Sequence, residues 1–547
     1  MLIYSDKLFK SPIGIIKAFS ERELVECFQK LDELRKSYYL VGYIRYEAKE
    51  VFHGRKIKSE LPLLYFEVFD KYEKFTPDKN SVSELNASAG ITFEEYKNAL
   101  TEIKNEIAEG NTYEVNYTYD WLVQSDSDPF CLYQSLLHKQ KTPYNAFFNN
   151  EYETVLSYSP ELFFELEGRH ILTKPMKGTI ARGETYEKDR ENIEFLKTDI
   201  KNRAENVMIV DLLRNDLGRI AKTGSVRVTK LFDVETHKTL HQMTSQIEAD
   251  LEDNVSLYDI FKAIFPCGSI TGAPKISTME IIDRVECGKR GVYCGAIGFI
   301  SPEKTVFSVP IRILQKAKND EVYKYRTGGA IVWDSDIKDE WEETFTKAKI
   351  LQNEFSLIET IKVQNNAMFL RDEHLRRLKE SAVEFGFKFN KAICEIEPEQ
   401  DGIMRIVLQK DGSFDVQYMP YARSMVNSIS ISDNILDSSN KFLRHKTTYK
   451  PWYEESYQKI KREEIYDEIF FNERGELCEG ARTNILLEID GKFYTPPLKC
   501  GLLNGVLRQN LLDSNVCVEK VLYKEDLLNA NSIYCINSVR GIKRVEL

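Results

Sequence analysis

The sequence predicts an α+β protein made of two folded modules, and three observations support this prediction. The chain has 547 residues, which is more than one hydrophobic core usually organises. Residues 162–173, LFFELEGRHILT, predict a strand hairpin that turns at Glu167 and Gly168. Residues 187–208 carry apolar side chains every three or four positions, which is typical of an amphipathic helix, with Glu205 near its C-terminal end.

The composition is that of an ordinary globular protein and argues against two classes of partner. Hydrophobic residues make up 42% of the chain, enough for a core in each module. The formal net charge of −11 disfavours nonspecific binding to nucleic acid or to an anionic membrane. The N-terminus lacks a signal-peptide pattern, and the ten cysteines include no CxxC pair. We therefore expect a cytoplasmic protein with reduced thiols.

Two breaks in the pattern predict the domain boundaries. The small polar stretch NSVSELNASAG precedes Thr92 and Glu95, whose spacing is a capping-box signature for a helix that ends near Glu109. This break divides an N-terminal subregion, residues 1–90, from a core, residues 91–354. A second break separates the charged helical stretch that ends near residue 353 from the strand-like LIETIKV, and it predicts a second module at residues 355–547.

Six segments of the first module carry a family pattern when they are taken in order. They are SPELF (159–163), TKPMKGT (173–179), AENVMIVDLLRNDLGR (204–219), GSITGAPK (268–275), RGVYCGAIG (290–298) and GGAIVWDSDIKDEWEET (328–344). Together they resemble the chorismate-utilising enzymes, and among these component I of aminodeoxychorismate synthase. The resemblance implies a large α+β domain with packed antiparallel sheets, which binds chorismate and adds an amino group at its C4 atom.

The resemblance also implies roles for named residues. Glu161 is expected to act as the general acid that helps the C4 hydroxyl leave, and Lys177 as a covalent catalyst. Glu205 and Glu343 are expected to hold Mg2+, which prefers carboxylate oxygens and water. The residues expected to contact the substrate are His241, Thr271, Tyr293, Arg312, Gly328 and Gly329.

Lys177 distinguishes between relatives. Anthranilate synthases carry a small residue at its place in the motif, so that ammonia attacks C2 of chorismate directly. A lysine can occupy C2 while the hydroxyl leaves, so that ammonia attacks C4 instead. Such a lysine must lose its proton, which burial or a nearby cation favours. Taken alone, a lysine beside a glycine turn is most often a solvated surface charge, and the accompanying motifs are what favour catalysis.

One residue departs from this pattern. The segment NTYEVN, residues 111–116, resembles a family segment in which the nitrogen-adding members usually have a glutamine, and Glu114 stands there. This departure leaves open an alternative activity for the first module, of the anthranilate synthase or isochorismate type.

Four segments of the second module resemble aminodeoxychorismate lyase, of the class IV pyridoxal-phosphate aminotransferases. They are LIETIKV (357–363), EHLRRLKESAVEFGF (373–387), FLRHKTTYK (442–450) and GELCEGARTNILL (475–487). The resemblance implies a smaller, two-lobed fold of type IV. It implies that Lys446 binds pyridoxal 5′-phosphate and moves protons, and that Glu479 faces the pyridine nitrogen. The implied phosphate cup consists of Arg377, Gly505, Val506, Leu507, Asn537 and Ser538.

Residues 501–512, GLLNGVLRQNLL, support that cup independently, because a glycine turn before a helix directs backbone N–H groups at an anion. The two resemblances together imply successive steps towards 4-aminobenzoate, a folate precursor. No glutaminase signature is present, so we expect a glutamine amidotransferase subunit to supply ammonia. A homodimer through the second module is expected by analogy. The alternative for this module is an amino-acid transaminase or a domain without catalysis.

Overall fold

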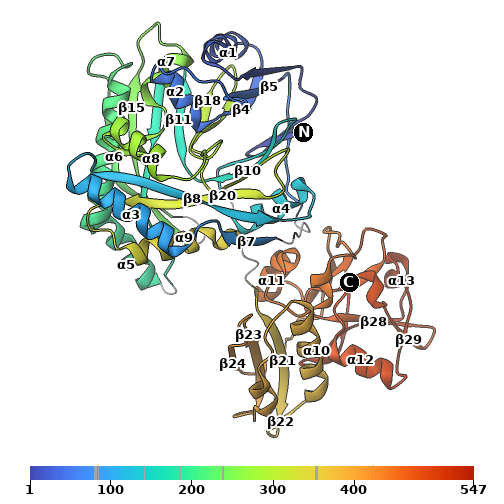
Figure 1. Ribbon diagram of the computed structural model, residues 1–547. Coiled ribbons are helices and arrows are strands. Elements are labelled where there is room, and N and C mark those ends of the chain that lie inside the picture. The colour runs from blue at the N-terminus through green and yellow to red at the C-terminus, as the bar shows by residue number, and fades with distance from the viewer. Residues whose placement is uncertain are drawn as a thin grey trace. The chain divides into compact units, whose positions relative to one another are not determined.

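The computed structural model describes residues 1–78, 83, 85–140, 142–183, 186–236, 240–351, 355–422 and 424–547 (Figure 1). The chain divides into two compact units. The first takes in Met1–Pro77 and Ser83–Gln352, and the second includes Asn353–Leu547. The expected joint between residues 354 and 355 borders residues outside the described ranges, so its position stays a prediction.

Two large antiparallel sheets form the first unit, and each has ten strands. The first sheet follows the order β16 (Gly272–Ala273), β8 (Glu114–Gln124), β20 (Tyr323–Ile331), β19 (Ile313–Ala317), β10 (Glu153–Ser159), β9 (Tyr144–Asn149), β1 (Leu2–Tyr4), β2 (Lys7–Phe9) and β6 (Glu73–Lys74), with β7 (Asn86–Ala89) beside β8. The second follows the order β13 (Met176–Ala181), β15 (Leu240–Asp250), β12 (His170–Lys174), β11 (Leu162–Glu167), β18 (Thr305–Ser308), β17 (Ala296–Ile300), β4 (Tyr39–Ile44), β5 (Leu64–Phe69) and β3 (Gly14–Ala18), with β14 (Arg227–Thr236) beside β15. The predicted α+β class with large antiparallel sheets is confirmed.

The first sheet buries both of its faces, because side chains along a strand point alternately to opposite sides. In β9, Ala146 and Phe148 join the cluster that also contains the second sheet's apolar side chains. Phe147, between them, joins a separate cluster with α3 (Phe93–Ala108) and α4 (Pro129–Lys139). Strands from the first 75 residues pair within both sheets, so the N-terminal subregion shares the architecture of the core.

The first unit has further helices and turns. They are α1 (Glu21–Leu34), α2 (Lys49–Phe52), α5 (Tyr186–Thr198), α6 (Ile200–Gly218), α7 (Leu257–Ile264), α8 (Lys275–Val285) and α9 (Ile337–Ala348), with short 3-10 turns η1 (Tyr46–Ala48), η2 (Gly268–Ile270) and η3 (Lys349–Leu351).

The helix predicted after Thr92 is confirmed as α3. The Glu95 backbone N–H donates to Thr92 Oγ1 at 3.3 Å, and the Thr92 N–H donates to Glu95 Oε2 at 2.7 Å. These two bonds satisfy N–H groups that the first turn of a helix leaves without partners. The hairpin of β11 and β12 is also confirmed, with Glu167 paired to His170 so that the turn begins at Gly168.

The single helix predicted over residues 187–208 is wrong. Two helices, α5 and α6, occupy this stretch, and Asp199 lies between them. The Asp199 carboxylate accepts a hydrogen bond from the Asn202 backbone N–H at 2.8 Å and so starts a new helix. Ile200, which the periodicity placed on the buried face, is 85% exposed. Glu205 therefore lies in the first half of α6 and not at a helix C-terminus.

The second unit has two lobes. The first lobe contains a four-stranded sheet of β22 (Ala367–Met368), β21 (Leu357–Gln364), β23 (Gly402–Leu408) and β24 (Phe414–Met419). Leu378 and Ala382 of α10 (Arg371–Glu384) pack on it. The other lobe contains β25 (Ile429–Ile431), β26 (Asp467–Phe471) and β27 (Leu477–Gly480), and a five-stranded sheet of β30 (Val518–Glu519), β29 (Lys492–Thr495), β28 (Asn484–Ile489), β31 (Ser532–Asn537) and β32 (Gly541–Val545).

The remaining helices of this unit are α11 (Glu454–Lys461), α12 (Val506–Asp513) and α13 (Lys524–Leu528), with 3-10 turns η4 (Lys391–Glu395), η5 (Lys441–Arg444), η6 (Pro451–Tyr453) and η7 (Leu498–Cys500). Within the described ranges, no helix of either unit is both long and apolar enough to cross a membrane.

Candidate active sites

Lys177 lies in β13, directly after the hairpin of β11 and β12. Its side chain is 12% exposed, and its Nζ donates a hydrogen bond at 3.0 Å to Oε1 of Glu114, which is fully buried. Gly178 follows with a φ of 76°, and a Cβ atom there would come within 2.8 Å of the Asn202 amide oxygen of α6. The glycine thus lets β13 approach α6 closely where the lysine points inward.

Glu161 lies between β10 and β11 and is 3% exposed. Burial raises the pKa of its carboxyl group to about 7, although a hydrogen bond with Ser269, the charge of Lys177 and the Met176 backbone oppose this shift. Its Oε1 atom has no hydrogen-bond partner among the described residues. A carboxyl group that keeps its proton near neutral pH suits the expected general acid.

The charge state of Lys177 differs from the sequence expectation of a freed amine. Burial lowers the pKa of its ammonium group, but the charges of Glu114, Glu205 and Glu161 outweigh burial and raise the pKa above its ordinary value. The site therefore gathers Lys177 with three carboxyl groups, and the resting lysine is an ammonium ion.

The two expected Mg2+ ligands lie on different helices. Glu205 is half-buried on α6, and its charge acts on Lys177. Glu343 lies on α9, is 53% exposed, and forms an ion pair with Lys347 at 2.6 Å. Lys347 also donates to the Gly328 carbonyl oxygen at 2.8 Å, which fixes α9 beside β20. Over the described ranges, no three carboxylate, histidine or cysteine groups gather at one point to hold a metal ion.

Two of the residues expected to contact substrate are completely buried. His241 in β15 pairs with Ile180 of β13, and its Nε2 lies 2.8 Å from Oδ1 of Asp189 on α5. Its Nδ1 lies 2.9 Å from the Thr236 hydroxyl. Thr271 ends η2, close in sequence to Ser269, and its hydroxyl donates to backbone carbonyls of the same turn. Both side chains are held in fixed orientations near the Lys177 cluster by their strands and turns.

Arg312 and Tyr293 are placed apart from that network. Arg312 has a φ of 56° and a half-buried side chain, and burial lowers the pKa of its guanidinium group. Such a backbone conformation is costly for a residue other than glycine and is often found at ligand sites. Burial raises the pKa of the Tyr293 phenol well above its ordinary value. The hydrogen bond and ion pair of Lys177 in the described part of the chain go to Glu114 and not to Arg312 or Tyr293.

Gly328 and Gly329 lie in β20 opposite Thr118 and Tyr117 of β8. A Cβ atom on Gly328 would lie 1.8 Å from the Tyr117 carbonyl oxygen, so the pairing of these strands requires glycine there. Since β8 begins at Glu114, the same strand joins this glycine pair to the lysine cluster.

In the second unit, Lys446 follows η5 and lies among charged groups. Burial, followed by the positive charges of Lys450 and Arg377, lowers the pKa of its amine to about 7, while Glu359 and Glu479 oppose this shift. A lysine that is partly neutral near pH 7 can both bind an aldehyde and carry a proton.

Glu479 in β27 is 4% exposed, and three hydrogen bonds hold it. The Tyr453 hydroxyl donates to Oε1 at 2.9 Å, and Oε2 accepts from the Leu503 backbone N–H at 3.1 Å and from the Asn484 amide at 3.3 Å. Burial raises the pKa of this carboxyl group. A second buried lysine, Lys450, acts on it electrostatically from the same segment as Lys446.

Arg377 of α10 forms a double ion pair with Glu359 of β21, with Nε–Oε1 and NH2–Oε2 distances of 2.8 and 2.7 Å. Its NH1 donates to the Asn504 carbonyl at 3.0 Å, beside Gly505. Three of its five N–H donors are thus occupied, and two remain for an anion. The Arg377 charge is the main cause that lowers the pKa of Glu359 to about 2, against the effect of burial.

The remaining residues of the expected cup surround the start of α12. Gly505 is its N-cap, and a Cβ atom there would lie 1.9 Å from the Asn484 amide oxygen. Val506 and Leu507 form the first turn, where backbone N–H groups are free to bind an anion. Asn537 ends β31 and donates to the Arg482 carbonyl at 3.2 Å, and Ser538 follows it. With Lys446 and Glu479, these donors fit pyridoxal phosphate by chemistry.

Comparison with known proteins identifies the families. Residues 67–353 match the chorismate binding enzyme family, and residues 356–547 match amino-transferase class IV. The first match spans more than half of the chain. The chain belongs to the chorismate binding enzymes. Its second unit is a class IV aminotransferase-like domain.

Aminodeoxychorismate synthase component 1 of Salmonella typhimurium is 40% identical over 254 residues, which are 46% of this chain and 56% of that protein. Anthranilate synthase component 1 of Aquifex aeolicus is 35% identical over 274 residues, 50% of this chain and 55% of that protein. The chain thus spans just over half the length of these curated relatives. The crystal structure of anthranilate synthase component I from Streptococcus pneumoniae shares the fold, with a TM-score of 0.56 at 23% identity over 64% of this chain and 92% of that one.

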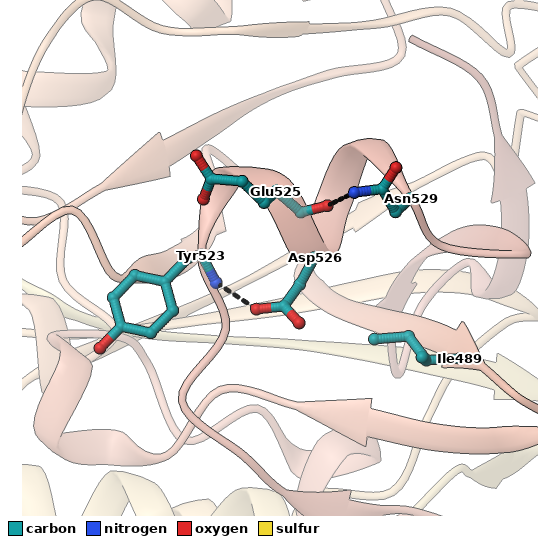
Figure 2. Close-up of a pocket in the computed structure, with 5 residues that line it drawn as sticks. All are labelled: Ile489, Tyr523, Glu525, Asp526 and Asn529. Carbon is teal, nitrogen blue, oxygen red and sulfur yellow. Dashed lines mark hydrogen bonds between the residues drawn. The ribbon is translucent and has the colours of Figure 1, made fainter.

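Figure 2 shows a surface hollow on the class IV domain, and none of its lining residues belongs to either candidate site. Its lining residues are Ile489, Tyr523, Glu525, Asp526 and Asn529. Asp526 accepts from the Tyr523 backbone N–H at 2.9 Å and caps α13, and Asn529 donates to the Glu525 carbonyl at 2.9 Å. Since the lining offers carboxylates and no cation, the hollow does not suit the anionic ligands of these families.

The sequence analysis did not predict several residues of the two sites. Ser269 lies inside the GSITGAPK segment and Glu359 inside LIETIKV, so the motifs gave a signal for both, whereas Asp189 lies in none of the motif segments. Lys450 follows Lys446 by four positions, and a second lysine so close in a candidate site was itself a signal. Glu114 was noticed only as a departure, and its contact with Lys177 required the fold.

Proposed function

We propose that this chain makes 4-aminobenzoate, a folate precursor, from chorismate in two steps. The first unit would replace the C4 hydroxyl by an amino group, and the second would eliminate pyruvate. One observation carries the proposal above all: Lys177 lies buried between Glu114 and Glu161, in a chorismate binding enzyme whose second unit places Lys446 near Glu479. The name of the Salmonella relative supports the first step.

In the first step, Lys177 Nζ forms a bond to C2 of the ring, and the ring double bonds shift towards C4. Glu161 gives its proton to the C4 hydroxyl, which leaves as water, since burial keeps this carboxyl group protonated near neutral pH. Ammonia then attacks C4, and the C2–N bond breaks. The amino group therefore ends opposite the ring carboxylate and not beside it.

Glu205 and Glu343 are the residues that would hold Mg2+, since their oxygen atoms match its preference and leave places for water and a substrate carboxylate. The metal ion would neutralise carboxylate charge on chorismate. Arg312, a half-buried cation, would bind the other carboxylate. His241, Thr271 and Tyr293 would face the ring, and the Gly328–Gly329 backbone would complete the clamp.

In the second step, the cofactor supplies an electron sink when it is bound. Lys446 takes the proton from C4 of the ring, and its neutral fraction near pH 7 suits this task. Glu479 keeps the pyridine nitrogen charged, while Arg377, residues 505–507, Asn537 and Ser538 hold the phosphate. Loss of the enolpyruvyl group produces an aromatic ring, so the elimination is strongly favourable.

We infer that ammonia comes from a separate glutamine amidotransferase subunit that docks on the first unit. A homodimer through the class IV domain is part of the same proposal, by analogy with that family. A reducing cytoplasm is also part of the proposal, in keeping with ten cysteines that are thiols.

Lysine variants of the full chain test both steps. Lys177→Ala should abolish 4-aminobenzoate formation from chorismate, whereas the control Lys174→Ala on the neighbouring strand should retain it. Lys446→Ala should accumulate aminodeoxychorismate without pyruvate, and Lys441→Ala serves as its control. A fully active Lys177→Ala variant would exclude the covalent route. Formation of anthranilate by the unaltered chain would support the alternative activity that Glu114 leaves open.

A further inference from the structure

The Lys177 ammonium group has a partner that the family pattern does not provide. Its Nζ lies 3.0 Å from Oε1 of Glu114, and the Glu114 side chain is fully buried at the start of β8. The other carboxylate oxygen, Oε2, has no hydrogen-bond partner in the described part of the chain. A buried carboxylate with an unused oxygen is costly unless it serves the group that it contacts.

Three carboxyl groups act on Lys177, and Glu114 holds its Nζ by a hydrogen bond of 3.0 Å. Glu205 on α6 and Glu161 before β11 also act on Lys177 by their charges, and Glu161 faces Ser269 and Cys267 in turn. Glu161 has the proposed role of general acid, and Glu205 is an expected Mg2+ ligand. Glu114 has neither of these roles, and its carboxylate accepts the hydrogen bond from Lys177 Nζ.

An ammonium ion has no lone pair and cannot attack C2 of chorismate, so the resting lysine must first lose a proton. A glutamine at this place could accept a hydrogen bond but could not take up that proton. A glutamate can do both. Glu114 can therefore prepare the nucleophile in a way that a glutamine could not.

Resting on the proposed function, we propose that Glu114 is the positioning residue that holds Lys177 and accepts its proton as the amine becomes a nucleophile. The proton moves from Nζ to the Glu114 carboxylate, and the neutral amine forms the N–C2 bond as the C4–O bond breaks. When ammonia attacks C4, the C2–N bond breaks, and Nζ regains its proton from Glu114. Glu161 is reprotonated as the new C4 ammonium group loses a proton.

The test compares the unaltered chain with Glu114→Gln and Glu114→Asp in saturating Mg2+ and ammonium, between about pH 6 and about pH 9. In Glu114→Gln the lysine must lose its proton to solvent. We therefore expect kcat for the first step to be about tenfold or more lower near pH 7 and to rise with pH towards the unaltered value. KM for chorismate should change little. Glu114→Asp, which retains a carboxylate, should restore the pH profile of the unaltered chain.

Pyruvate release from added aminodeoxychorismate serves as the internal control for the amount of enzyme, because Glu114 lies in the other unit. The calorimetric transition of the first unit checks that the variants fold. A Glu114→Gln profile parallel to that of the unaltered chain at every pH would overturn the inference and leave the proposed function intact. An unaltered chain that forms a product other than aminodeoxychorismate would overturn the proposed function and this inference together.

Discussion

At the scale of single residues, Lys446 has a local charge environment that sets a clear pH dependence. Burial and the charges of Lys450 and Arg377 lower its pKa to about 7. The amine must be neutral to take a proton, and one pH unit below the pKa leaves about one tenth of it neutral. We expect pyruvate release by the pyridoxal-phosphate-loaded chain to fall about tenfold from about pH 8 to about pH 6.

A variant separates this effect from general acid sensitivity. Lys450→Met removes a positive charge that lowers the pKa of Lys446, so the fall should move to higher pH. Lys441→Met, a change in η5, should leave the profile where it is. If the Lys450→Met profile coincides with that of the unaltered chain, Lys450 does not tune the amine.

Glu161 predicts a pH dependence opposite to that of Lys446, because an acid must be protonated to act. Its pKa of about 7 lies above the ordinary 4.5, so the acid is protonated below about pH 7 and loses its proton above. We expect Glu161→Gln to lower the first step by about 100-fold or more, since an amide cannot donate the proton. Because the pKa of Glu161 is raised from 4.5 to about 7, the unaltered chain loses stability as the pH rises between these values. Glu161→Gln has no such proton to lose, so at about pH 8 it should not melt at a lower temperature than the unaltered chain. Early melting there would show that Glu161 is structural.

The sequence could predict Glu161, Lys177, Lys446 and Glu479 as candidates because each lies in a contiguous motif. It could not predict the ion pair between Lys177 and Glu114. These residues are 63 positions apart and belong to different sheets, so only the packing of those sheets brings the charges to 3.0 Å. The packing also reverses the expected charge of Lys177, since burial is outweighed by Glu114, Glu205 and Glu161 together.

At the scale of elements, α6 carries Glu205, and its start depends on Asp199. We expect Asp199→Ala to lower the free energy of unfolding by about 0.5–2 kcal/mol, as loss of a helix N-cap does. Asp211→Ala on the same helix is a matched control, because Asp211 is 76% exposed and forms only a surface ion pair with Arg214. Chemical denaturation measures both. Equal effects of the two changes would contradict the capping role.

The contrast between α3 and α6 shows what a local pattern can predict. The capping box at Thr92 is a local arrangement, so four residues sufficed to predict where α3 begins. The break at Asp199 competes with a continuous apolar period, and the period was misleading because Ile200 and Val207 are exposed. Only the packing of α5 and α6 against β13 and β15 decides which face is buried, and that information is not local.

At the scale of the whole molecule, each hydrophobic cluster lies within one of the two units. We therefore expect two transitions in calorimetric unfolding of the full chain. Pyridoxal phosphate should move the transition of the class IV domain alone, by about 2.7 kcal/mol at a free concentration of about 100 times its Kd. Lys446→Ala serves as the control with weakened binding. A single calorimetric transition that pyridoxal phosphate shifts as a whole would mean that the two units unfold together.

The central claim concerns what the whole chain makes. The most direct measurement is to identify the products after incubating the purified chain with chorismate, Mg2+, ammonium and pyridoxal phosphate, by chromatography and mass spectrometry. Because Lys177 blocks C2 and Lys446 promotes elimination, we expect 4-aminobenzoate and pyruvate in equal amounts. Anthranilate in place of 4-aminobenzoate would contradict the account, since it would mean that ammonia, and not Lys177, attacks C2.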